Sequence, residues 1–192
     1  MLSIEVIEHC APTLAGIKTG NIFTVKNGEY EITKEIRKLN RILVKKGLRM
    51  IPIRKNSRHT LIYLYRPGRL RLDLKLPEAV EILSEKGYNT DNPKRALVQL
   101  VGHLAVDEEF PHEIGLFLGY PPSDVKCFME SPCNGVKCTG CWKVYSNQDD
   151  AQKTFERFQR CTEVYCRSAK KGRTLESLIV ASDDSKQRRY AS

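Results

Sequence analysis

The sequence contains no long hydrophobic segment, and we expect no secretory signal at its N-terminus. Its longest unbroken apolar or aromatic run is the five-residue stretch Leu61–Tyr65, whereas a membrane-spanning helix needs roughly 20 such residues. Acidic side chains at Glu5 and Glu8 occupy the region where a signal peptide would carry basic residues and then an apolar stretch. We therefore expect a cytoplasmic protein with no membrane partner.

The familiar catalytic signatures are also missing. The chain contains no phosphate-binding glycine loop, no nucleophile-elbow serine motif and no two-histidine helical metal motif. Its 192 residues are 41% hydrophobic and 29% charged, which is enough to build a core in one domain of roughly 150 residues. The sequence therefore indicates a folded protein without naming its reaction.

Local patterns predict an α+β fold, with a mixed α/β fold as the alternative. Residues 49–54 and 60–66 are rich in strand-forming side chains on either side of a short polar loop, which is typical of an antiparallel hairpin. Pro52 cannot donate to a central ladder, so the first of these strands is expected at a sheet edge or at a bulge. Further short strands are expected over residues 1–8 and 142–145.

Apolar residues recur at helical spacing along most of the remaining chain. The segments expected to be helical are about 12–18, 31–46, 77–86, 93–106 and 122–130, with a long helix that includes residues 151–165. We predict a single globular domain over residues 1–166, in which a small, at least partly antiparallel sheet is packed by five to six helices. A basic, polar and mobile tail is expected over residues 167–192, with one helical patch near residues 175–180.

Positive charge is concentrated in one segment. The net charge is +9, and residues 29–75 contain fourteen Lys or Arg against four acids, while the remainder contains 18 against 19. Four cations of the helix expected over residues 31–46 recur opposite an apolar stripe: Lys34, Lys38, Arg41 and Lys45. Such a face attracts an acidic protein or nucleic acid. The solvated side of any amphipathic surface helix shows the same pattern, and this second interpretation is favoured because the sequence contains no known nucleic-acid-binding motif.

The seven cysteines are unevenly spaced. In a cytoplasmic protein they are expected to be thiols, metal ligands or redox groups rather than structural disulfides. Two residues separate Cys138 from Cys141, a spacing that lets two thiolates bind one zinc ion, and Cys133 is a nearby third ligand. A zinc site, a thiol/disulfide switch and ordinary thiols all remain open, and no other cofactor is predicted.

Three segments resemble a known bacterial family. They are residues 9–18 (HCAPTLAGIK), 110–125 (FPHEIGLFLGYPPSDV) and 140–145 (GCWKVY). Together they resemble the family called domain of unknown function 3793, over roughly residues 3–167. The resemblance implies a bacterial protein and carries no activity, cofactor or catalytic residue.

The sharpest chemical hypothesis is a thiol-dependent hydrolase or transferase. Cys10 directly precedes the helix expected from Pro12, and the unpaired N–H groups of a helix start lower the pKa of a nearby thiol. His112 is the candidate partner base, with Glu113 or Asp124 to orient its ring. Two cations are candidates for binding a substrate carboxylate or phosphate, namely Lys18 and Lys143.

Each of these residues also has a structural interpretation. Cys10 is a small side chain suited to a core, His112 is suited to capping a turn after Pro111, and Glu113 is expected at the surface. The main alternative to an enzyme is therefore a non-catalytic binding or regulatory module that uses the basic surface. A cysteine-based metal or redox protein is the further alternative.

Overall fold

The computed structural model describes residues 2–28, 31–106 and 110–182. The chain forms two compact units, one made of Met1–Arg69 with Cys161–Ser192 and the other of Leu70–Arg160. The described residues contain nine α-helices and two antiparallel sheets, which confirms the α+β class and adds helices to the five or six predicted. The single domain expected over residues 1–166 stays a prediction.

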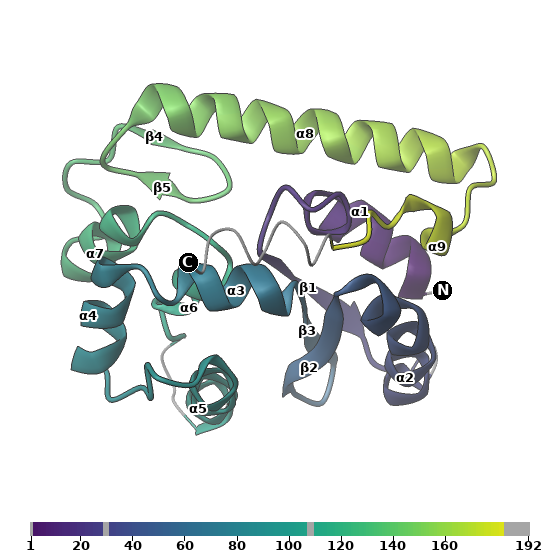
Figure 1. The fold of residues 1–192 in the computed structure, drawn as a ribbon, viewed down its shortest axis with the longest axis horizontal. Helices are drawn as coiled ribbons and strands as arrows, with labels where there is room; N and C mark the ends of the chain where they lie inside the picture. The colour runs from purple at the N-terminus through teal and green to yellow at the C-terminus, as the bar shows by residue number, and fades with distance from the viewer. Residues whose placement is uncertain (1, 29–30, 107–109, 183–192) are drawn as a thin grey trace. The chain divides into compact units, whose positions relative to one another are not determined.

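The first unit is built on a three-stranded antiparallel sheet (Figure 1). Its strands, in the spatial order β1-β3-β2, are β1 (Gly20–Lys26), β3 (His59–Tyr65) and β2 (Arg49–Lys55). The predicted hairpin is β2 and β3, and the register shifts between Pro52 and Arg54 on the edge strand β2. Both expectations for Pro52 are therefore confirmed. Proline has no backbone N–H to donate, and at an edge position or a bulge the sheet does not need that donor.

Helix α1 (Leu2–Leu14) replaces the strand expected over residues 1–8 and the helix expected from Pro12. The prediction was wrong because the short-range alternation suggested a strand, whereas a four-residue repeat indicates a helix. The residues of this repeat are all fully buried: Leu2, Val6, Cys10 and Leu14. Pro12 lies inside the last turns of α1, not at its first position.

Helix α2 (Ile32–Leu43) matches its prediction and continues as the 3-10 turn η1 (Val44–Lys46). Its buried face is the predicted apolar stripe of Ile32, Ile36, Leu39 and Leu43. Gly47 ends the helix with φ of 80°, and a Cβ added there would lie 2.4 Å from the Ser182 hydroxyl oxygen. Only glycine fits this cap without strain or displacement.

One face of the sheet forms the core with α1, α2 and the C-terminal segment. Helix α9 (Leu175–Leu178) lies in the stretch expected to be a mobile tail, and Leu175, Leu178 and Ile179 are buried in this core. The helical patch expected near residues 175–180 corresponds to α9. The mobility expected of residues 167–182 is wrong, because helix α8 (Gln148–Lys170) extends into this otherwise polar stretch and its three apolar side chains are packed. Residues 183–192 lie outside the described part of the chain.

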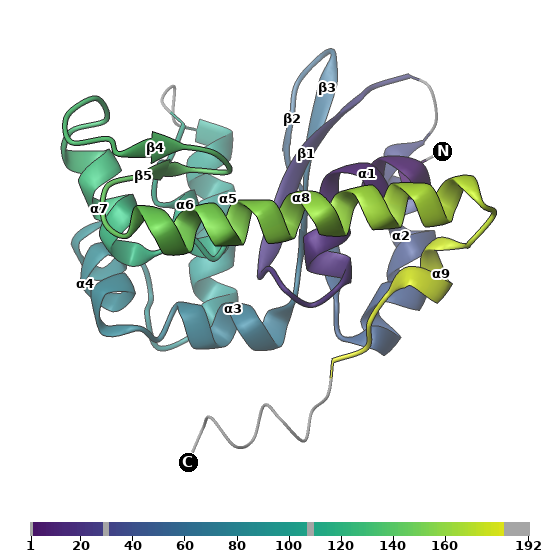
Figure 2. The same ribbon diagram turned by 90° about the horizontal axis from the view of Figure 1, so that it is seen from above.

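The second unit is mainly helical (Figure 2). Its elements are the end of α3 (Pro67–Asp73), α4 (Pro77–Glu85), α5 (Pro93–Val106), α6 (Ile114–Phe117), α7 (Pro122–Glu130), β4 (Cys138–Thr139), β5 (Lys143–Val144) and the first part of α8 (Gln148–Lys170). Strands β4 and β5 pair antiparallel. The helices predicted at 77–86, 93–106 and 122–130 correspond to α4, α5 and α7.

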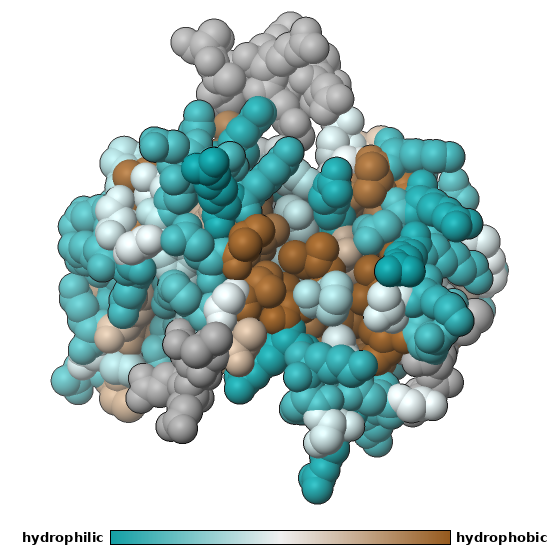
Figure 3. Space-filling model, turned by 90° about the horizontal axis from the view of Figure 1, so that it is seen from below, coloured by the Kyte–Doolittle hydropathy of each residue, from teal (hydrophilic) through white to brown (hydrophobic). Residues whose placement is uncertain are grey.

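Hydrophilic side chains cover most of the surface seen in Figure 3. Within the described residues, no helix is both long enough and apolar enough to cross a bilayer.

Candidate functional site

The second unit contains a cavity of about 170 Å³. Its walls come from α6, α7, β5 and the segments that precede them. Four aromatic and two basic side chains characterise the lining: Phe110, Tyr120, Phe128, Trp142, His112 and Lys143. Two of the segments that resemble the known family, 110–125 and 140–145, therefore supply most of one cavity.

Asp124 fixes the wall of this cavity from the first turn of α7. It is 2% exposed, and its Oδ2 accepts a hydrogen bond from the Trp142 indole N–H at 2.8 Å. Its Oδ1 accepts three more, from the backbone N–H of Tyr145 (3.0 Å), the backbone N–H of Ser146 (3.0 Å) and the Ser146 hydroxyl (2.8 Å). Four donors occupy the roughly four lone-pair positions of a carboxylate. Asp124 is thus a positioning group, with no oxygen left to orient His112.

Close packing of α6 on α7 shapes the adjoining wall. A Cβ added at Gly115 would lie 2.8 Å from Cγ2 of Val125 and 3.2 Å from the Tyr120 ring, so only glycine permits this approach. The Tyr120 ring lies 5.0 Å from Trp142. Burial raises the pKa of Tyr120, and the nearby Cys141 raises it further, so the phenol stays protonated at neutral pH.

The two basic side chains of the lining meet at Phe128. The His112 ring contacts Phe128 edge-on, with centroids 4.9 Å apart, and the Lys143 ammonium lies 5.5 Å from the centroid of the same ring. Lys143 also donates to the Pro132 carbonyl at 2.9 Å. The structure therefore brings together His112 and Lys143, which the sequence analysis assigned to the same site in different roles.

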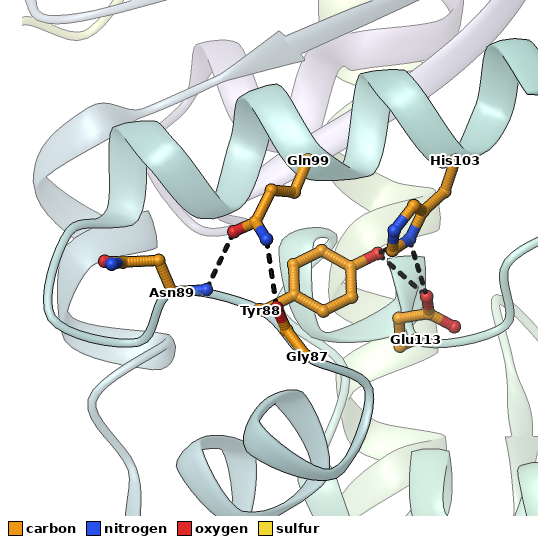
Figure 4. A network of polar contacts seen from close by, with 6 residues as sticks. All are labelled: Gly87, Tyr88, Asn89, Gln99, His103 and Glu113. Atoms are coloured by element: carbon orange, nitrogen blue, oxygen red, sulfur yellow. Dashed lines mark hydrogen bonds and ion pairs between the residues drawn. The ribbon is translucent and has the colours of Figure 1, made fainter.

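Glu113 belongs to a separate polar cluster, shown in Figure 4. The Tyr88 hydroxyl donates to its Oε1 at 2.8 Å and lies 2.9 Å from Nδ1 of His103. Because the single hydroxyl proton goes to Glu113, Nδ1 of His103 is the donor to Tyr88. His103 Nδ1 is also 3.7 Å from Glu113 Oε1. Glu113 is 5% exposed, so its expected surface position was wrong.

The loop that carries Tyr88 is fastened to α5 by Gln99. Its side-chain oxygen accepts from the backbone N–H of Asn89 at 2.7 Å, and its side-chain nitrogen donates to the Gly87 carbonyl at 3.0 Å (Figure 4). The cluster therefore joins α5, this loop and the start of α6 through a buried carboxylate and its donors.

Cys10 lies in the interior of α1 and not ahead of a helix start. It is 0% exposed within the apolar core of the first unit. Burial raises its pKa far above the ordinary value of 9.0, and the nearby Lys18 opposes that shift only in part. The premise of the thiolate hypothesis is therefore wrong, because the helix N-terminus expected beside Cys10 is about two turns away.

The predicted partners of Cys10 divide between the units. Lys18 is buried in the first unit near Cys10, while His112, Glu113 and Lys143 belong to the second. Among the described residues of the first unit, no imidazole lies within hydrogen-bonding distance of Cys10.

The candidate zinc ligands Cys133, Cys138 and Cys141 do not form a cluster of three within the described residues. Glu5, Glu8 and His9 are the described group of three whose ligand atoms lie within 4.8 Å of one another. None of the seven cysteines forms a disulfide. The zinc site at Cys133, Cys138 and Cys141 stays a prediction.

The four cations predicted on one face of the helix over residues 31–46 are all exposed, three of them on α2 and Lys45 on η1. They are Lys34, Lys38, Arg41 and Lys45, and Lys34 forms an ion pair with Glu31. The face is amphipathic as predicted, since the opposite side of α2 is buried.

A family model described as "Protein of unknown function (DUF3793)" matches residues 6–179. The chain belongs to this family. The resemblance seen in the sequence is confirmed, and it extends to include α9. No curated protein and no solved structure matches the chain significantly.

Sequence reasoning missed the roles of Tyr88 and Phe128 in this family member. Tyr88 follows the helix-ending Gly87, where a large buried aromatic signals a tertiary contact, but its partner Glu113 is distant in sequence. Phe128 shares the amphipathic helix α7 with Asp124 and Val125, and helical spacing alone gives no sign that its ring would lie between two basic groups.

Proposed function

We propose that this protein is a non-catalytic binding module whose second unit holds a small ligand in the aromatic cavity. The observation that carries the proposal is the cavity itself, which has a volume of about 170 Å³ and counts Phe128 and Trp142 among its lining residues. A cavity of roughly 150 Å³ can hold a benzene ring. Aromatic walls with a few polar groups are the usual composition of small-ligand sites.

The lining favours binding over catalysis. Within the described part of the chain, the residues that line the cavity include no serine, threonine or cysteine nucleophile. The carboxylate of the lining, Asp124, already accepts four hydrogen bonds. The thiol of Cys10 is a buried core group in the other unit, so a thiol-dependent hydrolase or transferase has no support from its surroundings.

The test uses Trp142, because it is the single tryptophan of the chain and lines the cavity. We expect small aromatic compounds at millimolar concentration to shift its indole N–H signal in a nitrogen-proton correlation spectrum. Phe128→Ala is expected to weaken these shifts at least severalfold by removing a wall. Val98→Ala is the control, because Val98 is 71% exposed and does not line the cavity.

An indole signal that no compound of such a library moves, in protein whose spectrum is dispersed and folded, would contradict the proposal. Equal shifts in the Phe128→Ala variant would place binding elsewhere and would contradict it too.

A second candidate function is binding of an acidic protein or nucleic acid by α2. Three exposed cations of α2 and Lys45 of the adjoining η1 favour it, together with the buried apolar face of α2 on the opposite side. Retention on immobilised DNA, RNA or polyglutamate should then fall steeply with salt, and Lys38→Glu with Arg41→Glu should abolish it. Lys153→Glu on α8, another exposed lysine, is the control. Retention that these α2 changes leave intact would exclude this face.

A further inference from the structure

We propose that the ligand of the cavity is a small aromatic carboxylic acid, bound as its anion with the carboxylate at Lys143 and His112. This inference rests on the proposed function and names the chemical class of the ligand. It follows from which polar groups at the cavity are already paired and which are not.

The walls select a flat, apolar body. Trp142 is fixed by its hydrogen bond to Asp124 and by an edge-on contact with Phe155, whose ring centroid lies 4.5 Å away. The centroid of the Tyr120 ring lies 5.0 Å from that of Trp142. An aromatic ligand that makes stacked or edge-on contacts with such walls binds with a more favourable free energy than its buried area alone would provide. The volume suits one ring with a short substituent.

The polar groups of the lining that still have N–H groups to offer belong to the positively charged Lys143 and to the imidazole of His112. Lys143 commits one of its three N–H groups to the Pro132 carbonyl. The two others have no acceptor within the described residues. The ring nitrogens of His112 likewise have no hydrogen-bond partner in the described part of the chain, and its ring is held by Phe128 alone. The charge of Asp124 is by contrast surrounded by donors of its own.

Two contacts already order the Lys143 ammonium. Its ammonium lies over the Phe128 ring at 5.5 Å, within the range of a cation–π contact. The Pro132 carbonyl that accepts from Lys143 also accepts from the Tyr145 hydroxyl at 3.0 Å. A side chain that is already ordered loses less entropy when it binds a ligand.

A carboxylate fits this donor set better than a phosphate. An ammonium with two N–H groups to offer and one imidazole match a monoanion with two oxygens. A dianionic phosphate ester would need further donors that the described lining does not provide.

Benzoate and benzamide form the decisive pair of probes, because they share size and shape and differ in charge. In titrations followed by the Trp142 indole signal, we expect benzoate to bind about tenfold or more tightly than benzamide, as a charge-assisted hydrogen bond implies. Lys143→Gln should bring the ratio of benzoate to benzamide affinity close to one, because the glutamine has no charge to offer the carboxylate. Lys143→Arg should keep the preference for benzoate, and so should the control Lys153→Gln on α8.

The outcomes separate the two proposals. Equal affinity for benzoate and benzamide would overturn the carboxylate assignment and leave the aromatic cavity as a binding site. Tighter binding of phenyl phosphate than of benzoate would also overturn the carboxylate assignment. No shift with any of the three probes, in folded protein that still responds to other aromatic compounds, would do the same, whereas no response to any compound would overturn the proposed function.

Discussion

A hydrogen bond between Trp142 and Asp124 holds one wall of the cavity in the second unit. The indole N–H of Trp142 donates to Oδ2 of Asp124 at 2.8 Å, which fixes a large aromatic wall on the first turn of α7. The other oxygen of Asp124 fastens the chain after β5 through Tyr145 and Ser146. One buried carboxylate therefore holds a helix, a strand end and an aromatic ring in a single arrangement.

Replacement of Asp124 by asparagine should weaken the hydrogen bonds that hold this wall. An amide has one oxygen and one NH₂ group, so at least one present donor would face another donor. We expect Asp124→Asn to lower the free energy of unfolding by about 2–3 kcal/mol and to shift the Trp142 emission maximum. Urea unfolding followed by fluorescence measures both. Asp149→Asn, at an exposed acid of α8, should change neither, and a stable Asp124→Asn protein with unchanged emission would refute the role.

The elements that the sequence predicted well are those whose signals are local. Helix α2 has a stripe, a run of cations and a terminal glycine, and the β2–β3 hairpin has strand formers around a polar loop. Pro52 also predicted the position of the bulge in β2. Each of these features follows from residues fewer than about twenty positions apart, where periodicity and turn chemistry act.

The cavity depends instead on partners that local pattern cannot pair. Asp124 was available as a candidate to orient a histidine, but its four donors lie about twenty residues further on. Cys10 was misplaced because a proline suited to a helix start actually lies near the end of α1. Tertiary packing of Leu2, Val6 and Leu14 outweighs that local preference.

The contact between Tyr88 and Glu113 should be worth more than an exposed hydrogen bond. Tyr88→Phe removes the donor and leaves a buried carboxylate short of a partner, so we expect a loss of about 1–3 kcal/mol in the free energy of unfolding. In a double-mutant cycle, Glu113→Gln with Tyr88→Phe should show a coupling energy of about 1 kcal/mol or more. Additive effects of the two changes would show that the contact contributes nothing of its own.

Arg66 should be among the most sensitive residues of the first unit. Its guanidinium is buried and donates to the carbonyls of Thr13 (2.7 Å), Leu14 (2.8 Å) and Val180 (2.7 Å), and to the Ser182 hydroxyl (2.9 Å). Burial lowers its pKa to about 10, which still leaves it charged at neutral pH. We expect Arg66→Met to cost about 3 kcal/mol or more of unfolding free energy, since it leaves three carbonyls without this donor.

The matched control for this change is Arg37→Met on the exposed side of α2, which should alter stability by less than about 0.5 kcal/mol. Amide hydrogen exchange gives an independent measurement, because the Val180 N–H donates to the Leu14 carbonyl at 3.0 Å. Arg66→Met should speed exchange at Val180 more than at β3. Unchanged exchange at Val180 would show that Arg66 does not hold the C-terminal segment.

Cys10 should make the protein less stable at alkaline pH. Burial raises its pKa above the ordinary 9.0, with a smaller opposing effect of Lys18. Below pH 9 the thiol is protonated in both the folded and the unfolded state, so it adds no pH dependence. Above pH 9 the unfolded state loses the proton that the folded state keeps, so the free energy of unfolding should fall by up to about 1.4 kcal/mol per pH unit. Several tyrosines with raised pKa values, such as Tyr65 and Tyr120, add to the same trend.

The difference between wild type and Cys10→Ala isolates the thiol, because the tyrosines are common to both proteins. Urea unfolding between pH 8 and pH 10.5 should give a shallower pH dependence for Cys10→Ala, and Cys133→Ala, at an exposed cysteine, should retain the wild-type slope. A thiol reagent at pH 8 should modify Cys133 in the folded protein and Cys10 only after unfolding. Rapid modification of Cys10 in the folded state, or identical slopes for wild type and Cys10→Ala, would show that this sulfur is accessible and would return the thiolate hypothesis to consideration.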